Sequence, residues 1–110
     1  MIENREFPRF AMALECRVLL GGIVVPGRSK DISRSGISCV LEQPLELSAL
    51  VDLEMSLAFG DNAYSEPLKL PAMVVWCTTV ADGHQVGAKF VDMTPELKRL
   101  LEVFIEYLEG

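Results

Sequence analysis

Two short motifs near the start of the chain carry the side chains best suited to bind an anionic ligand. The first is an RxxxR pair, Arg5 and Arg9, whose guanidinium groups can each donate paired hydrogen bonds to phosphate oxygens or to the O6 and N7 edge of guanine. In an extended segment, positions four apart lie on the same side, about 13 Å from one another at ~3.3 Å per residue. This distance suits the two ends of a folded dinucleotide better than one phosphate. The alternative is that both arginines lie on a solvated polar tail.

The second motif, DxSxxG, consists of Asp31, Ser33 and Gly36. The Asp31 carboxylate can accept hydrogen bonds from N1 and N2 of guanine, a pair of donors that adenine lacks. The Ser33 hydroxyl can donate or accept, and a glycine at position 36 permits positive φ or close approach of a ligand to the backbone. Because Asp, Ser and Gly also favour turns, a hairpin turn with no ligand is the alternative interpretation.

The distribution of charge favours a small anionic ligand near the N-terminal third. The 110 residues carry a net charge of −6, which argues against DNA or RNA as a partner. Residues 1–34 hold six Lys and Arg against four acidic residues, whereas residues 35–110 hold four against twelve. Candidate electrostatic helpers are Asn4, Arg28, Lys30 and Arg34, with plain solvent-exposed groups as the alternative.

The remaining polar residues do not predict an enzyme or a metal site. His84 follows a predicted Asp82–Gly83 turn with no activated nucleophile beside it, so we expect a histidine in a surface loop. Asp52 and Glu54 alternate with apolar residues, which is typical of the solvated face of a strand. We therefore expect no catalytic residues, no metal and no cofactor.

The cysteines and the apolar runs indicate a soluble cytoplasmic protein. Cys16, Cys39 and Cys77 are odd in number and lie in apolar stretches without a CxxC pair, which predicts buried thiols in a reducing compartment. No segment has the apolar core of a signal peptide or the roughly 18 apolar residues needed to cross a bilayer. We expect no membrane insertion.

The elements that must position these residues are short strands followed by one helix. Residues 1–12 are expected to form an extended arm, and residues 13–110 a small antiparallel β-barrel of six to seven strands with a C-terminal helix. The strands are predicted at 13–20, 23–25, 29–32, 37–41, 51–57, 72–80 and 86–91, with a Gly21–Gly22 hairpin, a break at Pro26–Gly27 and a polar loop over 60–67.

The end of the chain changes to helical periodicity. Thr94 is the predicted N-cap and Pro95 the first helical residue. The apolar stripe that follows either packs on the barrel or binds a partner; it consists of Leu97, Leu100, Leu101, Phe104, Ile105 and Leu108. Trp76 is expected to be a core anchor of the barrel, with ligand stacking as the alternative.

Several of these segments resemble a PilZ domain from about Arg5 to Leu108: the arm, the DxSxxG motif, residues 74–76, residues 86–90 and the closing helix. PilZ domains are small β-barrels that act as bacterial receptors for cyclic di-GMP. The resemblance implies that Arg5 and Arg9 bind the phosphates and guanines, and that Asp31, Ser33 and Gly36 form the facing wall of the site. Strongly basic members often carry another arginine where this chain has Asn4, which leaves one or two bound nucleotides open.

The resemblance predicts a cyclic di-GMP receptor or adaptor whose arm orders on the ligand and which signals to a separate protein partner. Because only four residues precede Arg5 and the helix closes the chain, we expect no attached output domain. The chain is expected to be a monomer or a weak homodimer. The alternative function is a protein-interaction barrel that does not bind nucleotide.

Overall fold

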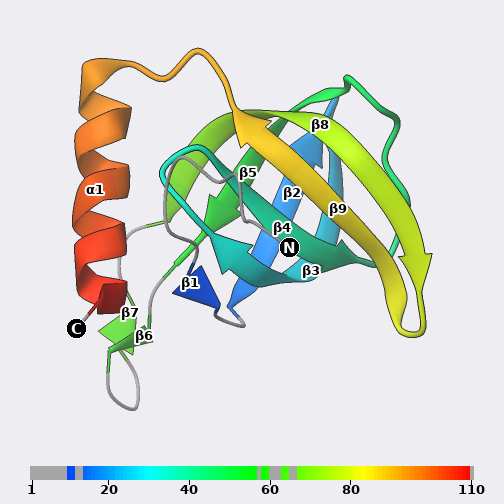
Figure 1. Cartoon of the computed structure of the whole chain (residues 1–110), viewed down its shortest axis with the longest axis horizontal. Helices are drawn as coiled ribbons and strands as arrows, with labels where there is room; N and C mark the ends of the chain where they lie inside the picture. Colours follow the sequence, from blue (N-terminus) through cyan, green and yellow to red (C-terminus); the bar gives the residue numbers. More distant parts are fainter. Residues whose placement is uncertain (1–9, 12–13, 57, 60–62, 65–66, 110) are drawn as a thin grey trace, which may run out of the picture.

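The computed structural model describes residues 10–11, 14–56, 58–59, 63–64 and 67–109. Alternating burial along the strands and a helical stripe at the end produce a barrel flanked by one helix (Figure 1). The elements are β1 (Phe10–Ala11), β2 (Glu15–Leu20), β3 (Ile23–Ile32), β4 (Gly36–Leu41), β5 (Leu50–Met55), β6 (Ala58–Phe59), β7 (Ala63–Tyr64), β8 (Leu68–Val80), β9 (Gly83–Phe90) and α1 (Pro95–Glu109).

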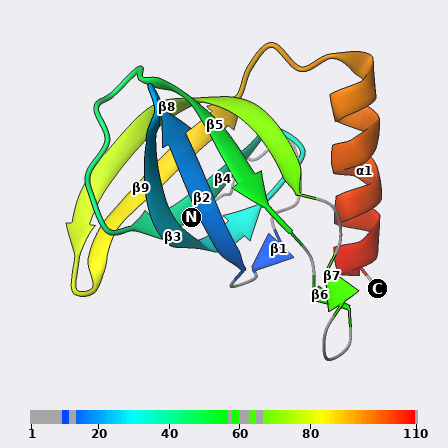
Figure 2. The same cartoon turned by 180° about the vertical axis from the view of Figure 1, so that it is seen from behind.

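Six strands close the barrel in the order β3, β2, β5, β8, β9 and β4, and a β3–β4 pairing completes the ring. Every neighbouring pair is antiparallel. Figure 2 shows the same closed wall from behind, with β1 beside β3 near the lower end of the barrel. Closure leaves these six strands without unpaired edges. The predicted class, an antiparallel barrel with a C-terminal helix, is confirmed.

The predicted break at Pro26–Gly27 is wrong, because β3 continues through both residues. The Pro26 carbonyl accepts a hydrogen bond from the Glu42 backbone N–H at 3.3 Å, so this side of Pro26 faces the end of β4. A backbone N–H at position 26 would point to the same side as this carbonyl, away from β2. The missing donor therefore does not disturb the pairing of Pro26 with Arg17. A Cβ at position 27 would overlap the backbone of β4, which explains the glycine.

Of the other local predictions, one is confirmed and one is wrong, and one strand pair was not predicted. Gly21 and Gly22 form the β2–β3 turn with positive φ, as predicted. The short β6–β7 pair was not predicted, and it occupies part of the expected loop over 60–67, most of which lies outside the described residues. His84 is half-buried in β9 rather than in a surface loop, since the strand begins at Gly83.

The core lies inside the barrel and extends to the inner face of α1. Its largest fully buried side chains include Ile32, Ile37, Leu53, Leu70 and Ile105. Cys16 and Cys39 are buried free thiols as predicted, and Cys77 is half-buried. A hydrogen bond that the Cys39 thiol donates to Cys16, together with burial, raises the pKa of Cys39 and keeps this thiol uncharged.

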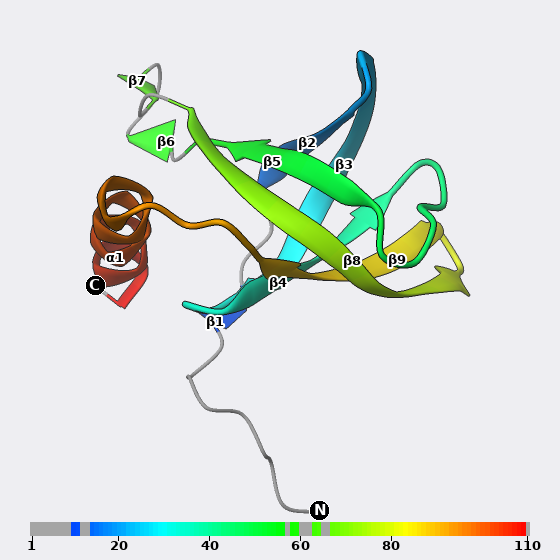
Figure 3. The same cartoon turned by 90° about the horizontal axis from the view of Figure 1, so that it is seen from above.

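The helix α1 lies beside the barrel (Figure 3). The Thr94 hydroxyl accepts a hydrogen bond from the Leu97 N–H at 3.1 Å, which confirms the predicted N-cap. Leu101, Phe104 and Ile105 are buried against the barrel, so the packing interpretation of the stripe is confirmed for its central residues. Within the described residues, no helix is long and apolar enough to span a membrane.

Candidate ligand-binding site

The DxSxxG motif forms the end of β3, the turn at residues 33–35 and the start of β4; we call residues 33–35 the motif turn. The Ser33 N–H donates to the Gly36 carbonyl at 2.9 Å, and the Ser35 N–H donates to the Ser33 Oγ at 3.2 Å. Ser33 is 1% exposed, and its hydroxyl lies 3.1 Å from that of Ser35. The Ser33 hydroxyl therefore shapes the motif turn from within, while Ser35 is exposed to solvent.

Gly36 serves the close packing of two strands. The φ angle of Gly36 is not positive, so a left-handed backbone conformation does not explain the glycine at this position. A Cβ at position 36 would lie 2.5 Å from the Ala88 carbonyl oxygen of β9. Glycine thus allows β4 to begin directly against β9, which fixes the position of the motif turn.

A row of four residues crosses four neighbouring strands from the motif to a tryptophan. In the strand register, Asp31 of β3 lies opposite Ser38 of β4. Ser38 lies opposite Gly87 of β9, which in turn lies opposite Trp76 of β8. At ~4.8 Å between strands the row spans about 14 Å, similar to the dimension of a folded dinucleotide. We call these four residues the outer row.

Trp76 lies on the outer surface of the barrel, so its predicted place in the core is wrong. A bulge at Val75 shifts the β8–β9 register between Val74 and Trp76, and both Val75 and Trp76 become exposed. The Trp76 indole covers Gly87, because a Cβ at position 87 would overlap the ring. The indole remains 41% exposed and is therefore available to a planar ligand.

Ser38, Gly87 and Trp76 of the outer row line a small hollow of about 130 Å³ beside the motif turn. Its lining includes Ser35, Gly36, Ser38, Trp76 and Lys89. Ser38 is 4% exposed, and its hydroxyl accepts a hydrogen bond from the Gln85 Nε2 at 3.2 Å. The hollow thus combines an aromatic face, a polar floor and one cation, Lys89, whose side chain is exposed. Sequence reasoning missed Ser38 and Lys89, which no local motif marks.

The candidate basic helpers separate into two groups. Arg28 and Lys30 are exposed on β3, and Lys30 is the extra residue of a bulge between Ser29 and Asp31. Arg34 is instead tied to α1, because its Nε donates to Glu102 Oε1 at 2.7 Å. This hydrogen bond holds the pKa of the Glu102 carboxyl below its usual range.

Asn4, Arg5 and Arg9 lie outside the described residues. The strand β1, however, begins at Phe10, the residue that directly follows Arg9 in the sequence. In β1, Phe10 pairs with Ile32 and Ala11 pairs with Asp31. The two residues that follow the RxxxR motif in the sequence therefore pair with the end of β3, where the DxSxxG motif begins.

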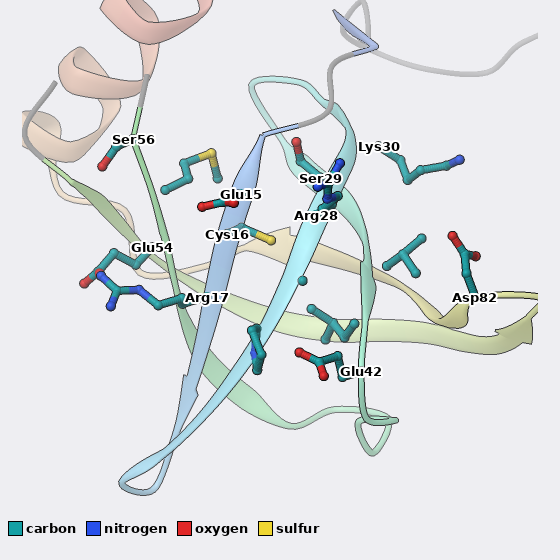
Figure 4. Close-up of a pocket in the computed structure, with 15 residues that line it drawn as sticks. Glu15, Cys16, Arg17, Arg28, Ser29, Lys30, Glu42, Glu54, Ser56 and Asp82 are labelled. Atoms are coloured by element: carbon teal, nitrogen blue, oxygen red, sulfur yellow. The ribbon is translucent and has the colours of Figure 1, made fainter. Parts of the chain in front are cut away.

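A second, larger hollow of about 860 Å³ lies on the outer wall over β2, β3, β4 and β5 (Figure 4). Arg28 and Lys30 line it, but Arg17 is paired with Glu54. Its acidic residues are Glu15, Glu42, Glu54 and Asp82. Carboxylates on several sides make this hollow a poor site for an anion. Within the described part of the chain, no three His, Cys, Asp or Glu side chains gather as metal ligands.

Comparison with known proteins identifies the fold. Three similar structures are the PilZ domain of YcgR from Escherichia coli with c-di-GMP, the MrkH–c-di-GMP complex from K. pneumonia, and the PilZ domain of CeSA from a cellulose-synthesizing bacterium. Their TM-scores are 0.78, 0.78 and 0.66 at 16%, 20% and 20% identity. The alignments cover 97%, 98% and 94% of this chain, and 92%, 52% and 99% of those chains.

This chain thus spans about half the length of the MrkH chain that it matches. No curated relative matches it significantly. The PilZ domain family matches residues 3–107, which include both motifs, the barrel and most of α1. The chain belongs to the PilZ domain family.

Proposed function

We propose that this protein is a cyclic di-GMP receptor. The observation that carries the proposal is the pairing of β1 with β3, in which Ala11, two residues after the RxxxR motif in the sequence, lies opposite Asp31 at one end of the outer row. The DxSxxG motif and an exposed indole lie along one stretch of wall whose length suits a dinucleotide. Two similar structures, YcgR and MrkH, are complexes with c-di-GMP, which supports the same ligand for this chain.

Each part of the site has a distinct task in this proposal. Asp31 accepts hydrogen bonds from N1 and N2 of one guanine. The Trp76 face stacks on a base, and Ser33 and Gly36 hold the motif turn in place. Residues 1–12 act as an arm whose Arg5 and Arg9 clamp the phosphates and guanines against the barrel of residues 13–110. These tasks are binding tasks, so the protein acts as a receptor or adaptor rather than as an enzyme.

The signal passes from the site to a separate protein partner through α1. The motif turn has two connections in that direction: the Arg34–Glu102 ion pair, and the Ser35 carbonyl, which accepts a hydrogen bond from the Phe90 N–H at 2.9 Å at the end of β9. A ligand that moves the motif turn therefore changes the contacts that connect this turn to α1. The arm, once closed over the ligand, presents a second altered surface.

Isothermal titration calorimetry with cyclic di-GMP tests the proposal. We expect saturable heat from the parent protein, weaker binding by Arg9→Ala, and no comparable heat with cyclic di-AMP, since adenine lacks the paired donors that Asp31 recognises. Absence of heat from folded parent protein at high micromolar concentrations would contradict the receptor function and favour a barrel that binds only proteins. The number of ligands per chain follows from the same titration.

Amide hydrogen exchange tests the arm separately. Ligand is expected to slow exchange in residues 3–10 and at the motif turn, because the arginines become fixed against the phosphates. Unchanged exchange in residues 3–10 at saturation, together with positive calorimetry, would leave the receptor intact but rule out the arm as its moving part.

A further inference from the structure

The helix α1 has a second apolar face besides the one packed on the barrel. Leu100, Val103 and Tyr107 are 46%, 59% and 50% exposed, although they belong to the same helix as the buried Leu101 and Phe104. Their spacing of three and four residues places them on one side of the helix, forming what we call the apolar strip. The helix stands beside the barrel with one side turned outward (Figure 1). A solvated helix face is normally polar, so the apolar strip indicates a contact surface.

Two opposite charges lie along one edge of the apolar strip. Arg99 and Glu106 are both exposed and are seven residues apart, which places them nearly two helical turns from each other. This separation, on the order of 10 Å, is too long for an ion pair within one helix. Among the described residues, the ion pairs are those of Arg17 with Glu54 and Arg34 with Glu102. The edge therefore offers one cation and one anion at a fixed spacing.

This arrangement of charges is self-complementary when two helices pack antiparallel about a two-fold axis near Val103. Leu100 of one helix then faces Tyr107 of the other, and the two Val103 side chains meet at the axis. A perpendicular two-fold axis keeps corresponding edges on the same side, so Arg99 of each copy lies next to Glu106 of the other. A parallel pair would bring this charged edge against the barrel-facing edge instead, and would lose both ion pairs.

We infer that the apolar strip of α1 docks a second copy of this chain in antiparallel orientation. Three apolar side chains per copy give an interface at the small end of the known range, so the dimer is weak and forms at high local concentration. Glu102, which binds Arg34, lies outside the strip, so the candidate ligand site stays accessible in the dimer. The inference stands independently of nucleotide binding.

Sedimentation equilibrium of the whole chain from 10 µM to 1 mM tests the apolar strip. The parent is expected to shift toward twice its monomer mass as concentration rises. Leu100→Glu should raise the dissociation constant at least tenfold, because it buries a charge without a partner. Leu47→Glu is the matched control, since Leu47 is 65% exposed on a loop away from α1, and should dimerise like the parent. A parent that stays monomeric at 1 mM would overturn the inference and assign the strip to another protein.

Charge exchange tests the antiparallel orientation. Arg99→Glu and Glu106→Arg should each weaken the dimer about fivefold or more, because each places like charges at two symmetric positions. The double variant Arg99→Glu/Glu106→Arg should return to within about twofold of the parent. Single variants without effect, or a double variant no better than the singles, would overturn the orientation. Unchanged melting temperatures verify that each variant is folded.

Discussion

Of the two hollows on the outer wall, the larger has the less suitable lining for an anionic ligand and the smaller has the more suitable one. The large hollow has about 860 Å³ of space but is lined by carboxylates and an internal ion pair. The small hollow has about 130 Å³ yet lies beside the motif turn and under an exposed indole. A flat dinucleotide that lies along a barrel wall needs aligned partners rather than a deep cavity. The proposed function therefore assigns the ligand to the small hollow by chemistry and alignment rather than by volume.

The strongest test of the comparison is loss of the carboxylate in the outer row. Asp31→Ala should weaken cyclic di-GMP binding on the order of 100-fold, because charge-assisted hydrogen bonds contribute about 1.5–3 kcal/mol each. Glu42→Ala, in the large hollow, should leave affinity unchanged. Calorimetry of both variants decides between the hollows. A larger effect at Glu42 than at Asp31 would place the ligand in the large hollow.

The second-largest loss of affinity is expected when the Trp76 indole is removed. Trp76→Ala should weaken binding about tenfold, since stacking of a base on an aromatic ring contributes ~1–3 kcal/mol. Trp76→Phe should retain most of the affinity. Val24→Ala is a suitable control, because Val24 is 52% exposed on the same barrel away from the outer row. Equal affinity of Trp76→Ala and parent would confine the ligand to the motif turn.

The two hollows also show which parts of the site a sequence can reveal. The Gly21–Gly22 turn and the Thr94 cap were predictable because their signals are local. The DxSxxG motif stands out in the sequence for the same reason, and the binding roles of Asp31 and Ser33 stay predictions. The exposure of Trp76 was not, because a bulge that depends on pairing with β9 reverses the side on which its side chain lies.

The continuity of β3 through Pro26–Gly27 depends in the same way on where β4 ends. The partner of Arg34 lies 68 residues away, so spacing in the sequence gave no indication of it. Local chemistry was therefore predictable, whereas contacts set by neighbouring strands were not.

A smaller effect is expected from the two cations of β3 that line the large hollow. Arg28→Ala and Lys30→Ala should each weaken binding about two- to threefold at low salt, since both side chains are exposed and act at a distance. The effect should disappear at high salt. The double variant Arg17→Ala/Glu54→Ala should change nothing, because it removes two charges that compensate each other. Salt-independent losses at Arg28 or Lys30 would indicate direct contact and extend the site toward the large hollow.

The smallest effect concerns the connection from the small hollow to α1. The Arg34 hydrogen bond lowers the pKa of Glu102 in the folded state, so the ion pair stabilises the fold fully above the ordinary glutamate pKa of 4.5. This contribution is lost as pH falls through the lower folded-state pKa. Glu102→Gln should therefore lower the melting temperature by about 1–2 °C at pH 7, and this effect should diminish as pH falls below 4.5.

The exposed loop substitution Glu46→Gln is the control for this measurement. With ligand bound, hydrogen exchange in α1 should respond less in Glu102→Gln than in the parent, because the turn has lost one of its two connections toward the helix. An identical response in both proteins would contradict the ion pair as a route for the signal. It would leave the Ser35–Phe90 hydrogen bond, and the strand β9 behind it, as the connection between ligand and helix.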